Sequence, residues 1–209
     1  MHDVRLGDGR DLRLRPTRTS DTRAMQDLFY RLSDDDRETR FLHKLSSLTD
    51  SAAQHLCSVD YEEEMAFAAV VGPAADERIV AASCYYLNPA TGLAEVAYRV
   101  DPDWQGLGLG GILHAELVEY ARDHGARGLT ADVLLGNTRM MRVFERGDHS
   151  LSVKTAGGVE ELTMPFRARA SRRPGRAPGR SAAGRCGALR SAGRCCRPGC
   201  PTSASRPPA

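Results

Sequence analysis

The pattern of apolar and polar residues predicts a chain that begins with a β-hairpin and continues into helices. Apolar and charged side chains alternate over Asp3–Pro16 on either side of a glycine-rich turn, which is typical of two short paired strands. Apolar residues then recur at helical spacing. Ser20, Ser33 and Thr49 precede these stretches, and hydroxyl side chains at such positions predict three helix starts.

The middle of the chain predicts strands instead. Turn-forming stretches such as Gly72-Pro73 separate three apolar segments, at Met65–Val71, Ile79–Leu87 and Leu93–Val100. Connections this short predict an antiparallel meander.

After Val100 a glycine-rich loop leads into a predicted helix from about Gly110 to His124. The strand expected next, Leu129–Leu134, should run parallel to the strand that ends at Val100, because loop, helix and strand together make a crossover. A helix and a final pair of strands complete the pattern, over Asn137–Glu145, Leu151–Val153 and Val159–Met164. The predicted fold class is α+β with a mixed sheet.

Charge divides the chain into two unlike parts. Residues 1–166 carry 18 Lys and Arg against all 27 Asp and Glu, a net charge of −9, whereas residues 167–209 carry 11 Arg and no acidic residue. Arg, Ala, Gly, Pro, Ser and Cys make up 41 of the last 43 residues. Such a segment has too little apolar surface to offset its chain entropy. We therefore predict one folded domain over residues 1–166 and a disordered tail over residues 167–209.

Composition also bears on compartment and partners. No stretch approaches the roughly 18 consecutive apolar residues that a transmembrane helix needs, and no secretory signal is evident at the start. Only Cys57 and Cys84 lie in the first 166 residues, which is typical of reduced, buried thiols. The four cysteines of the tail do not have zinc-site spacing. We expect a cytoplasmic protein with no membrane partner and no metal, and nucleic acid is an unlikely partner.

The strongest chemical signal is the stretch DPDWQGLGLGG from Asp101 to Gly111, in which a glycine loop runs from a strand directly into a helix. Exposed amides at a helix N-terminus attract anions, and glycines let a phosphate approach the backbone closely. A phosphate-bearing ligand is implied. Gln105, Gly108 and Gly110 match the Gln/Arg-x-x-G-x-G/A pattern that grips the pyrophosphate of coenzyme A.

Two other interpretations of the loop are open. Gly106, Gly108 and Gly111 match the dinucleotide-binding pattern G-x-G-x-x-G, but five residues separate Val100 from Gly106 and an antiparallel meander precedes the loop. The context therefore favours coenzyme A over a dinucleotide. The structural alternative is a glycine-rich turn that only tightens the packing between strand and helix.

With this loop in place, residues 3–166 resemble the GNAT superfamily of acyl-CoA-dependent N-acetyltransferases. Leu12–Pro16 with Asp21, the pair Arg40-Phe41 and the lead-in Val59–Met65 resemble the subgroup that contains bacterial protein lysine acetyltransferases. The resemblance implies a mixed, mostly antiparallel sheet with helices on both faces, splayed at the acyl-CoA site. It also implies acetyl-CoA as a cosubstrate.

The resemblance assigns cofactor-binding residues by position. Backbone groups near Tyr98 and Val100 would pair with the pantetheine arm. Asn137 matches the asparagine that relatives use to hold the cofactor from the next helix, although it also suits the N-cap of that helix. The pyrophosphate would be held by the loop residues Gln105, Gly106, Leu107, Gly108, Leu109, Gly110, Gly111 and Ile112.

Glu95 is the candidate catalytic residue, because it matches the position of the catalytic glutamate in this subgroup. A lysine ammonium with a pKa of about 10.4 is only about 1 part in 2,500 neutral at pH 7, so attack without a base loses roughly 4.6 kcal/mol. A partly buried carboxylate would accept that proton directly or through water. The alternative is a solvent-facing glutamate paired with a cation, although Arg99 on the same face lies about 13 Å along the strand.

Two positions depart from the family pattern. Phe144 stands where many relatives place a tyrosine that protonates the departing thiolate, so that hydroxyl is absent. Arg146-Gly147-Asp148-His149 replaces a common Leu-Gly-Phe, which makes the shape of the acceptor site uncertain.

The sequence thus predicts an N-acetyltransferase that moves an acetyl group from acetyl-CoA to an amine by direct attack, with a protein lysine as the favoured acceptor. A small-molecule amine acetyltransferase and a non-catalytic acyl-CoA-binding regulatory domain are the alternatives. Cys84 is expected to be a buried thiol rather than a nucleophile. Asp34–Asp36 is expected to be a solvated helix start rather than a cation site.

Overall fold

The computed structural model describes residues 1–41 and 47–167, which belong to one compact unit. The predicted tail lies outside the described residues, apart from Arg167. The described ranges contain eight strands, five α-helices and two 3₁₀ turns. In chain order these are β1 (His2–Arg5), β2 (Asp11–Pro16), η1 (Thr19–Asp21), α1 (Thr22–Arg31), α2 (Asp34–Phe41), α3 (Asp50–Cys57), β3 (Glu64–Val71), β4 (Arg78–Asn88), β5 (Leu93–Val100), η2 (Pro102–Trp104), α4 (Leu109–Asp123), β6 (Gly128–Leu134), α5 (Thr138–Glu145), β7 (Ser152–Ala156) and β8 (Val159–Pro165).

The strands form a single mixed sheet in the order β1-β2-β3-β4-β5-β6-β8-β7. Only the pair β5–β6 is parallel among the described strands, and the other neighbours are antiparallel. The predicted α+β class and the crossover from β5 through α4 to β6 are confirmed.

The parallel pair is short, and this splays the sheet. Pairing joins Leu93, Ala94 and Glu95 to residues 128–130 and then stops. Strand β6 continues along β8 as far as Leu134, whereas β5 continues from Val96 to Val100 without a β6 partner in the described part of the chain. The splay that the sequence predicts is therefore present.

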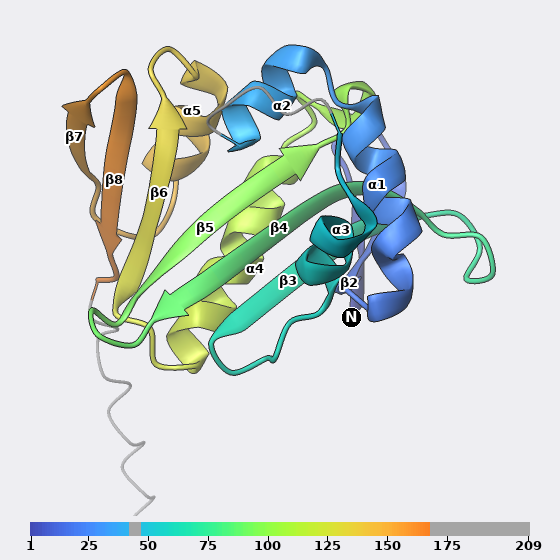
Figure 1. Ribbon diagram of the computed structural model, residues 1–209, viewed down its shortest axis with the longest axis horizontal. Helices are drawn as coiled ribbons and strands as arrows, with labels where there is room; N and C mark the ends of the chain where they lie inside the picture. The colour runs from blue at the N-terminus through green and yellow to red at the C-terminus, as the bar shows by residue number, and fades with distance from the viewer. Residues whose placement is uncertain (42–46, 168–209) are drawn as a thin grey trace, which may run out of the picture. The chain divides into compact units, whose positions relative to one another are not determined.

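Helices cover both faces of the sheet (Figure 1). Helix α4 buries Leu113 and Leu117 in the main core, together with Val80 and Val96 from the sheet. On the other face α1 packs Met25 and Leu28 against residues of β3 and β4. Neighbouring residues of β5 alternate between these faces.

Side-chain caps start the helices at two of the three predicted positions. The Ser33 hydroxyl accepts from the amide of Asp36, and the Thr49 hydroxyl accepts from the amide of Ala52. Ser20 does not cap α1, because the short turn η1 intervenes and α1 begins at Thr22.

A buried ion pair explains this difference at the start of α1. Arg15 donates to both carboxylate oxygens of Asp21, at 2.8 and 2.9 Å, and also to Glu77 at 2.7 Å. Both Arg15 and Asp21 are buried. Burial alone would raise the pKa of Asp21, but hydrogen bonds from Arg15 and Arg18 outweigh it and the pKa lies below its usual range. Asp21 therefore anchors the turn before the helix to β2.

Asp101 anchors the point where β5 leads into the glycine loop. Its carboxylate accepts from Arg31 of α1 at 2.7 Å, from Arg78 of β4 at 2.8 Å and from the amide of Asp103 at 3.1 Å. Asp101 is 1% exposed. Burial raises the pKa of this carboxyl, yet the two arginines outweigh it and the pKa is lowered. The start of the glycine loop is thus fixed to helix α1 and to the neighbouring strand β4.

A chain of buried hydrogen bonds links β5, α4 and the segment after α5. The Tyr98 hydroxyl lies 2.8 Å from Nδ1 of His114, the two Nε2 atoms of His114 and His149 lie 2.9 Å apart, and Nδ1 of His149 lies 3.1 Å from the carbonyl oxygen of Ser150. The Ser150 carbonyl only accepts, so His149 donates from Nδ1 and accepts at Nε2. His114 must then donate from Nε2, and Tyr98 must donate to His114. The whole chain is satisfied with both imidazoles neutral.

The hydrogen bonds from Tyr98 to Ser150 account for the departure from Leu-Gly-Phe at Arg146–His149. His149 is buried, whereas Asp148 is exposed and pairs with Arg122. A Cβ atom at Gly147 would lie 2.1 Å from Nε2 of His149, so only glycine leaves room for the imidazole pair. This stretch therefore packs against α4, through His149 with His114 and through Asp148 with Arg122.

The buried imidazole predicts acid sensitivity. Burial, together with the neighbouring His149, lowers the pKa of His114 to about 4. An unfolded histidine has a pKa of about 6.5, so the unfolded state binds the proton first and stability falls as the pH drops from about 6.5 to 4. His114 alone should contribute a loss of about 3 kcal/mol in unfolding free energy across that window.

Urea unfolding at several pH values between 7.5 and 4.5 checks this expectation. His114→Phe should be less stable than the wild type at pH 7.5, because Tyr98 and His149 lose their partner, and its stability should depend less on pH. His55→Gln, at an exposed position on α3, should keep the wild-type pH dependence. An identical slope in His114→Phe would show that His114 does not cause the acid sensitivity.

Candidate active site

The glycine loop forms an uncapped helix start. Gly106 and Gly108 adopt φ values of +76° and +84°, a conformation that other residues rarely take. Gly108 is the N-cap of α4 and has no side chain to satisfy the first amides of the helix. Those amides lack acceptors within the helix, and the helix dipole adds positive potential there.

Space for a ligand lies beside these amides. A Cβ atom at Gly106, Gly108 or Gly111 would meet no other atom within 4 Å, and one at Gly110 would touch Val143 at 3.4 Å. A group as large as a phosphate can therefore approach the backbone from the open side. The loop fits a phosphate-bearing ligand.

One predicted loop contact is already used within the protein. The amide of Ile112 donates to the carbonyl of Gly108 at 3.2 Å, as the first hydrogen bond of α4. The amide of Ile112 is therefore engaged within the helix, and its predicted contact with the pyrophosphate stays a prediction. The amides of Leu107, Gly108, Leu109, Gly110 and Gly111 remain candidates.

The unpaired edge of β5 faces the splay. The amide of Asp101 donates to Val80 on β4, so the backbone groups of odd-numbered residues point to β4. Successive residues of a strand direct their backbone groups to opposite edges. Those of Val96, Tyr98 and Val100 consequently point toward β6. Tyr98 and Val100 lie where the sequence places them, and Val96 is an additional position that the same alternation identifies.

Gln105 joins three elements at the end of β5. Its Nε2 donates to Asp36 of α2 at 3.0 Å and to the carbonyl of Val100 at 3.2 Å, and its Oε1 accepts from Arg139 of α5. The Asp36 side chain is only 18% exposed, so it is not part of a solvated helix start as expected. Sequence patterns could not reveal this cluster, because Asp36, Gln105 and Arg139 are far apart along the chain.

Asn137 is the N-cap of α5. Its side-chain oxygen accepts from the amide of Met140 at 3.1 Å, which confirms the capping role. Asn137 also borders a hollow of about 310 Å³ between α2 and the loop that follows β6. A role in holding the cofactor stays a prediction, and it is compatible with the cap because capping uses only the oxygen.

Glu95 lies where the sheet begins to open. It is the last residue of β5 that pairs with β6, opposite Thr130, and its antiparallel partner on β4 is Tyr86. The Glu95 side chain lies on the face opposite α4 and is exposed, not partly buried as expected. Glu95 therefore faces solvent, as the alternative interpretation expects, but no Lys, Arg or His of the described ranges forms an ion pair with it, and its catalytic role stays a prediction.

On α5, the buried ring of Phe144 lies at the position where many relatives have a tyrosine. Phe144 is 1% exposed and packs edge-on against Tyr98 and His114. The Tyr98 hydroxyl is committed to His114, and burial raises its pKa well above 10. Neither Phe144 nor Tyr98 therefore supplies the hydroxyl that many relatives have at this position.

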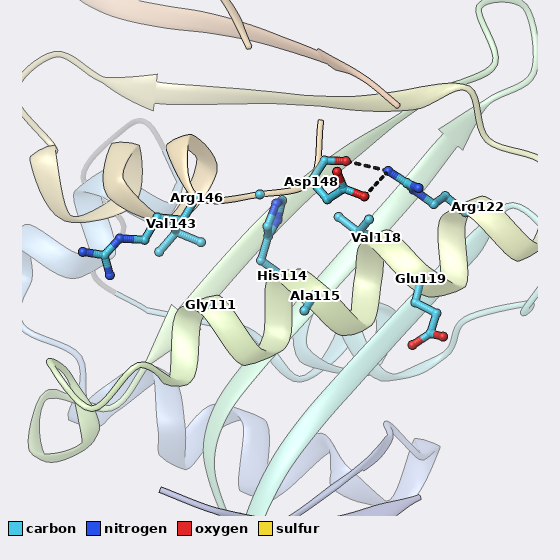
Figure 2. Close-up of a pocket in the computed structure, with 10 residues that line it drawn as sticks. Gly111, His114, Ala115, Val118, Glu119, Arg122, Val143, Arg146 and Asp148 are labelled. Atoms are coloured by element: carbon cyan, nitrogen blue, oxygen red, sulfur yellow. Dashed lines mark hydrogen bonds and ion pairs between the residues drawn. The ribbon is translucent and has the colours of Figure 1, made fainter. Parts of the chain in front are cut away.

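A groove of about 370 Å³ lies between α4 and the segment after α5 (Figure 2). Figure 2 shows Arg122 directed at Asp148 along one side, with Val118 and Val143 pointing into the space between the helices. Glu95 does not line this groove, so it is distinct from the predicted catalytic position.

Other predicted features concern chemistry outside this site. Cys57 and Cys84 are buried thiols, and burial raises the pKa of Cys57 to about 11. Within residues 1–41 and 47–167, no group of three or more His, Cys, Asp or Glu side chains is arranged to hold a metal ion. No helix in the same ranges is long and apolar enough to cross a membrane.

Known proteins share both this sequence pattern and this fold. The model of the acetyltransferase (GNAT) family matches residues 20–148. An acetyltransferase of Pseudomonas aeruginosa is 34% identical over 122 residues, which span 58% of this chain and 66% of that relative. The crystal structure of the GNAT domain of S. lividans PAT is 26% identical, with a TM-score of 0.71 over 79% of this chain and 96% of that one.

A more distant relative shares the fold alone. A GCN5-related N-acetyltransferase from Kribbella flavida has a TM-score of 0.61 at 19% identity and covers 74% of this chain. The family match spans more than half of the chain and includes the glycine loop, the splayed strands and Glu95. On this evidence the chain belongs to the GNAT family of acetyltransferases.

Proposed function

We propose that this protein is an acetyl-CoA-dependent N-acetyltransferase that acts on protein lysines. The observation that carries the proposal is the position of Glu95, exposed at the residue where β5 and β6 separate. The open loop at Gly106–Gly111 lies at the other end of the same strand and supports binding of the coenzyme phosphates. Donor and acceptor would therefore meet along β5.

The chemistry follows from what each part of the site offers. Acetyl-CoA supplies the acetyl group as a thioester. The backbone groups of Val96 and Tyr98 and the amide of Val100 would offer hydrogen bonds to an extended arm along the open edge of β5, whereas the carbonyl of Val100 already accepts from Gln105. Glu95 would take one proton from the attacking ammonium, directly or through water, so that the neutral amine forms the new amide bond. Attack by the neutral amine leaves an extra proton on the nitrogen, which would be lost to solvent as the C–S bond breaks. The departing thiolate would take its proton from solvent, because Phe144 has no hydroxyl.

The surroundings of Glu95 favour a large acceptor. Exposed side chains continue across the same face, at Asp132 on β6 and Glu161 on β8, and all five residues of β7 are exposed. Figure 1 shows no helix over β6, β8 and β7 on the side that α1 and α3 occupy. Small molecules bind in pockets that enclose them, whereas a lysine on the surface of another protein can reach a site on an open sheet face. The resemblance to bacterial protein lysine acetyltransferases supports the same acceptor.

Gly111 allows coenzyme binding to be tested without straining the backbone. It lies in the first turn of α4, and a side chain there would meet open space. Gly111→Glu should stabilise the helix start through its charge but repel a phosphate bound at the same amides. We expect an affinity for CoA at least tenfold weaker by titration calorimetry, with an unchanged or higher melting temperature. This combination separates lost binding from lost folding.

The matched control is Gly111→Gln, which has the same size without the charge. It should weaken CoA binding less than Gly111→Glu does. Equal affinity of the wild type and Gly111→Glu would contradict a phosphate site at the loop.

Glu95→Gln should keep CoA affinity and lose most turnover near neutral pH. The amide has the same shape but cannot accept a proton, and general-base catalysis is typically worth roughly 10²- to 10⁴-fold. The defect should shrink toward pH 10, where more lysine is already neutral. Rate against pH for both proteins measures this.

Glu161→Gln is the control, since Glu161 is another exposed carboxylate on the same face of the sheet. It should leave turnover near the wild-type value. A Glu95→Gln defect that stays constant up to pH 10 would indicate positioning instead of proton transfer.

Isotope labelling tests the acceptor. The purified protein is incubated with radiolabelled acetyl-CoA and a cell lysate, and the label is divided between macromolecules and small molecules by filtration. We expect label on lysines of the protein fraction, identified by mass spectrometry, above the level in lysate without added protein, and little increase over that level with Glu95→Gln. Label confined to the filtrate would indicate a small amine, and CoA binding without any transfer would indicate a regulatory domain.

A further inference from the structure

Three charged or polar side chains meet at the C-terminal end of β5. Gln105 connects Asp36 and Arg139, as described above, and Nη2 of Arg139 also lies 3.4 Å from Oδ1 of Asp36. Asp36 belongs to α2, Gln105 to the glycine loop and Arg139 to the second position of α5. The cluster thus joins α2 to α5 beside the open edge of β5.

We propose that Arg139 binds a phosphate of the coenzyme, and that Asp36 occupies Arg139 and Gln105 in the ligand-free protein. Coenzyme binding would then replace the carboxylate of Asp36 with a phosphate oxygen. This inference rests on the proposed binding of CoA at the glycine loop and adds two residues to that site.

The donors of the cluster are those that a phosphate requires. The guanidinium of Arg139 offers a planar fork of N–H groups that suits a carboxylate and a phosphate equally well. Gln105 belongs to the loop, one residue before Gly106, where a Cβ atom would meet open space. A phosphate seated on the loop amides would therefore lie next to a side chain that Arg139 already contacts.

The side chains of Arg139 and Asp36 differ in how free they are to move. The Arg139 side chain is 67% exposed, whereas that of Asp36 is 18% exposed. The Asp36 carboxylate also accepts from the Ser33 hydroxyl at 2.7 Å, which holds it at the start of α2. Arg139 is consequently the partner that can turn toward a ligand, and Asp36 keeps a donor when it does.

The exchange predicts opposite effects for the two residues. Removing the charge of Asp36 removes a competitor, so Asp36→Asn should bind CoA about two- to fivefold more tightly, the range expected for an exposed ion pair. Removing the cation removes a phosphate contact, so Arg139→Gln should bind CoA about tenfold more weakly or worse. If the ion pair only supported the fold, both substitutions would act in the same direction.

Titration calorimetry with CoA and with pantetheine, which lacks the phosphates, tests the exchange. Both substitutions should change the CoA affinity and leave the pantetheine affinity unchanged. In the double variant with Arg139→Gln, Asp36→Asn should tighten binding less than it does alone, because only the competition for Gln105 remains. Circular dichroism of each variant checks that the fold is kept.

Two controls change charge without touching the cluster. Asp34→Asn removes an acid from the same turn of α2, where the side chain is 91% exposed, and Arg142→Gln removes an exposed cation one turn along α5. Both should leave CoA affinity within about twofold of wild type, since exposed charges at this distance are screened by salt.

The outcomes separate this inference from the function on which it rests. If Asp36→Asn bound CoA more weakly, or Arg139→Gln bound it unchanged, the exchange would be overturned. The coenzyme site would still stand in that case, provided that the wild type binds CoA. Absence of CoA binding by the wild type would overturn both.

Discussion

The end of pairing between β5 and β6 after Glu95 determines where everything else in the site lies. A parallel pair begins at Leu93 and stops within three residues, because β6 then follows β8. Backbone groups in a protein interior need hydrogen-bond partners, and those of Val96, Tyr98 and Val100 face the gap. The gap therefore leaves an unpaired strand edge to which an extended ligand can hydrogen-bond. Glu95 lies at the end where β5 and β6 are still paired, and the glycine loop lies at the other end.

Buried polar interactions hold the β5 side of this gap at a fixed position. Asp101 ties the end of β5 to α1 and β4, and the chain from Tyr98 through His114 and His149 ties the same strand to α4. Each of these groups has its partners, and removing one would leave another buried and unsatisfied. A site bordered in this way requires little ordering when a ligand binds, so more of the contact energy contributes to affinity.

Local donors, not overall charge, make this domain suitable for an anion. Residues 1–166 carry a net charge of −9, and exposed charges act weakly beyond about 8 Å at physiological salt. The amides at the start of α4 and the guanidinium of Arg139 lie at the loop itself. The exposed acids on the face of Glu95 give that face a negative charge, which would suit the cationic acceptor proposed above. The two substrates of a transfer reaction would thus meet different potentials on the two sides of β5.

Local patterns in the sequence were sufficient for the elements, the class of the fold and the glycine loop. Alternation and helical spacing depend on near neighbours, and the loop motif carries its chemistry within eleven residues from Asp101 to Gly111. The capping role of Asn137 and the parallel direction of β6 followed from the same short-range rules.

Contacts between distant residues were decided by the tertiary structure alone. The burial of Asp101 against Arg31 and Arg78, the neutral imidazole pair of His114 and His149, and the contact of Asp36 with Gln105 and Arg139 each join segments that no local pattern relates. The exposure of Glu95 is of the same kind, because it depends on which helices cover the sheet. Sequence by itself therefore determined which chemistry the chain carries, whereas packing decided which side chains face the ligand, since hydrogen bonds and burial depend on distance in space and not along the chain.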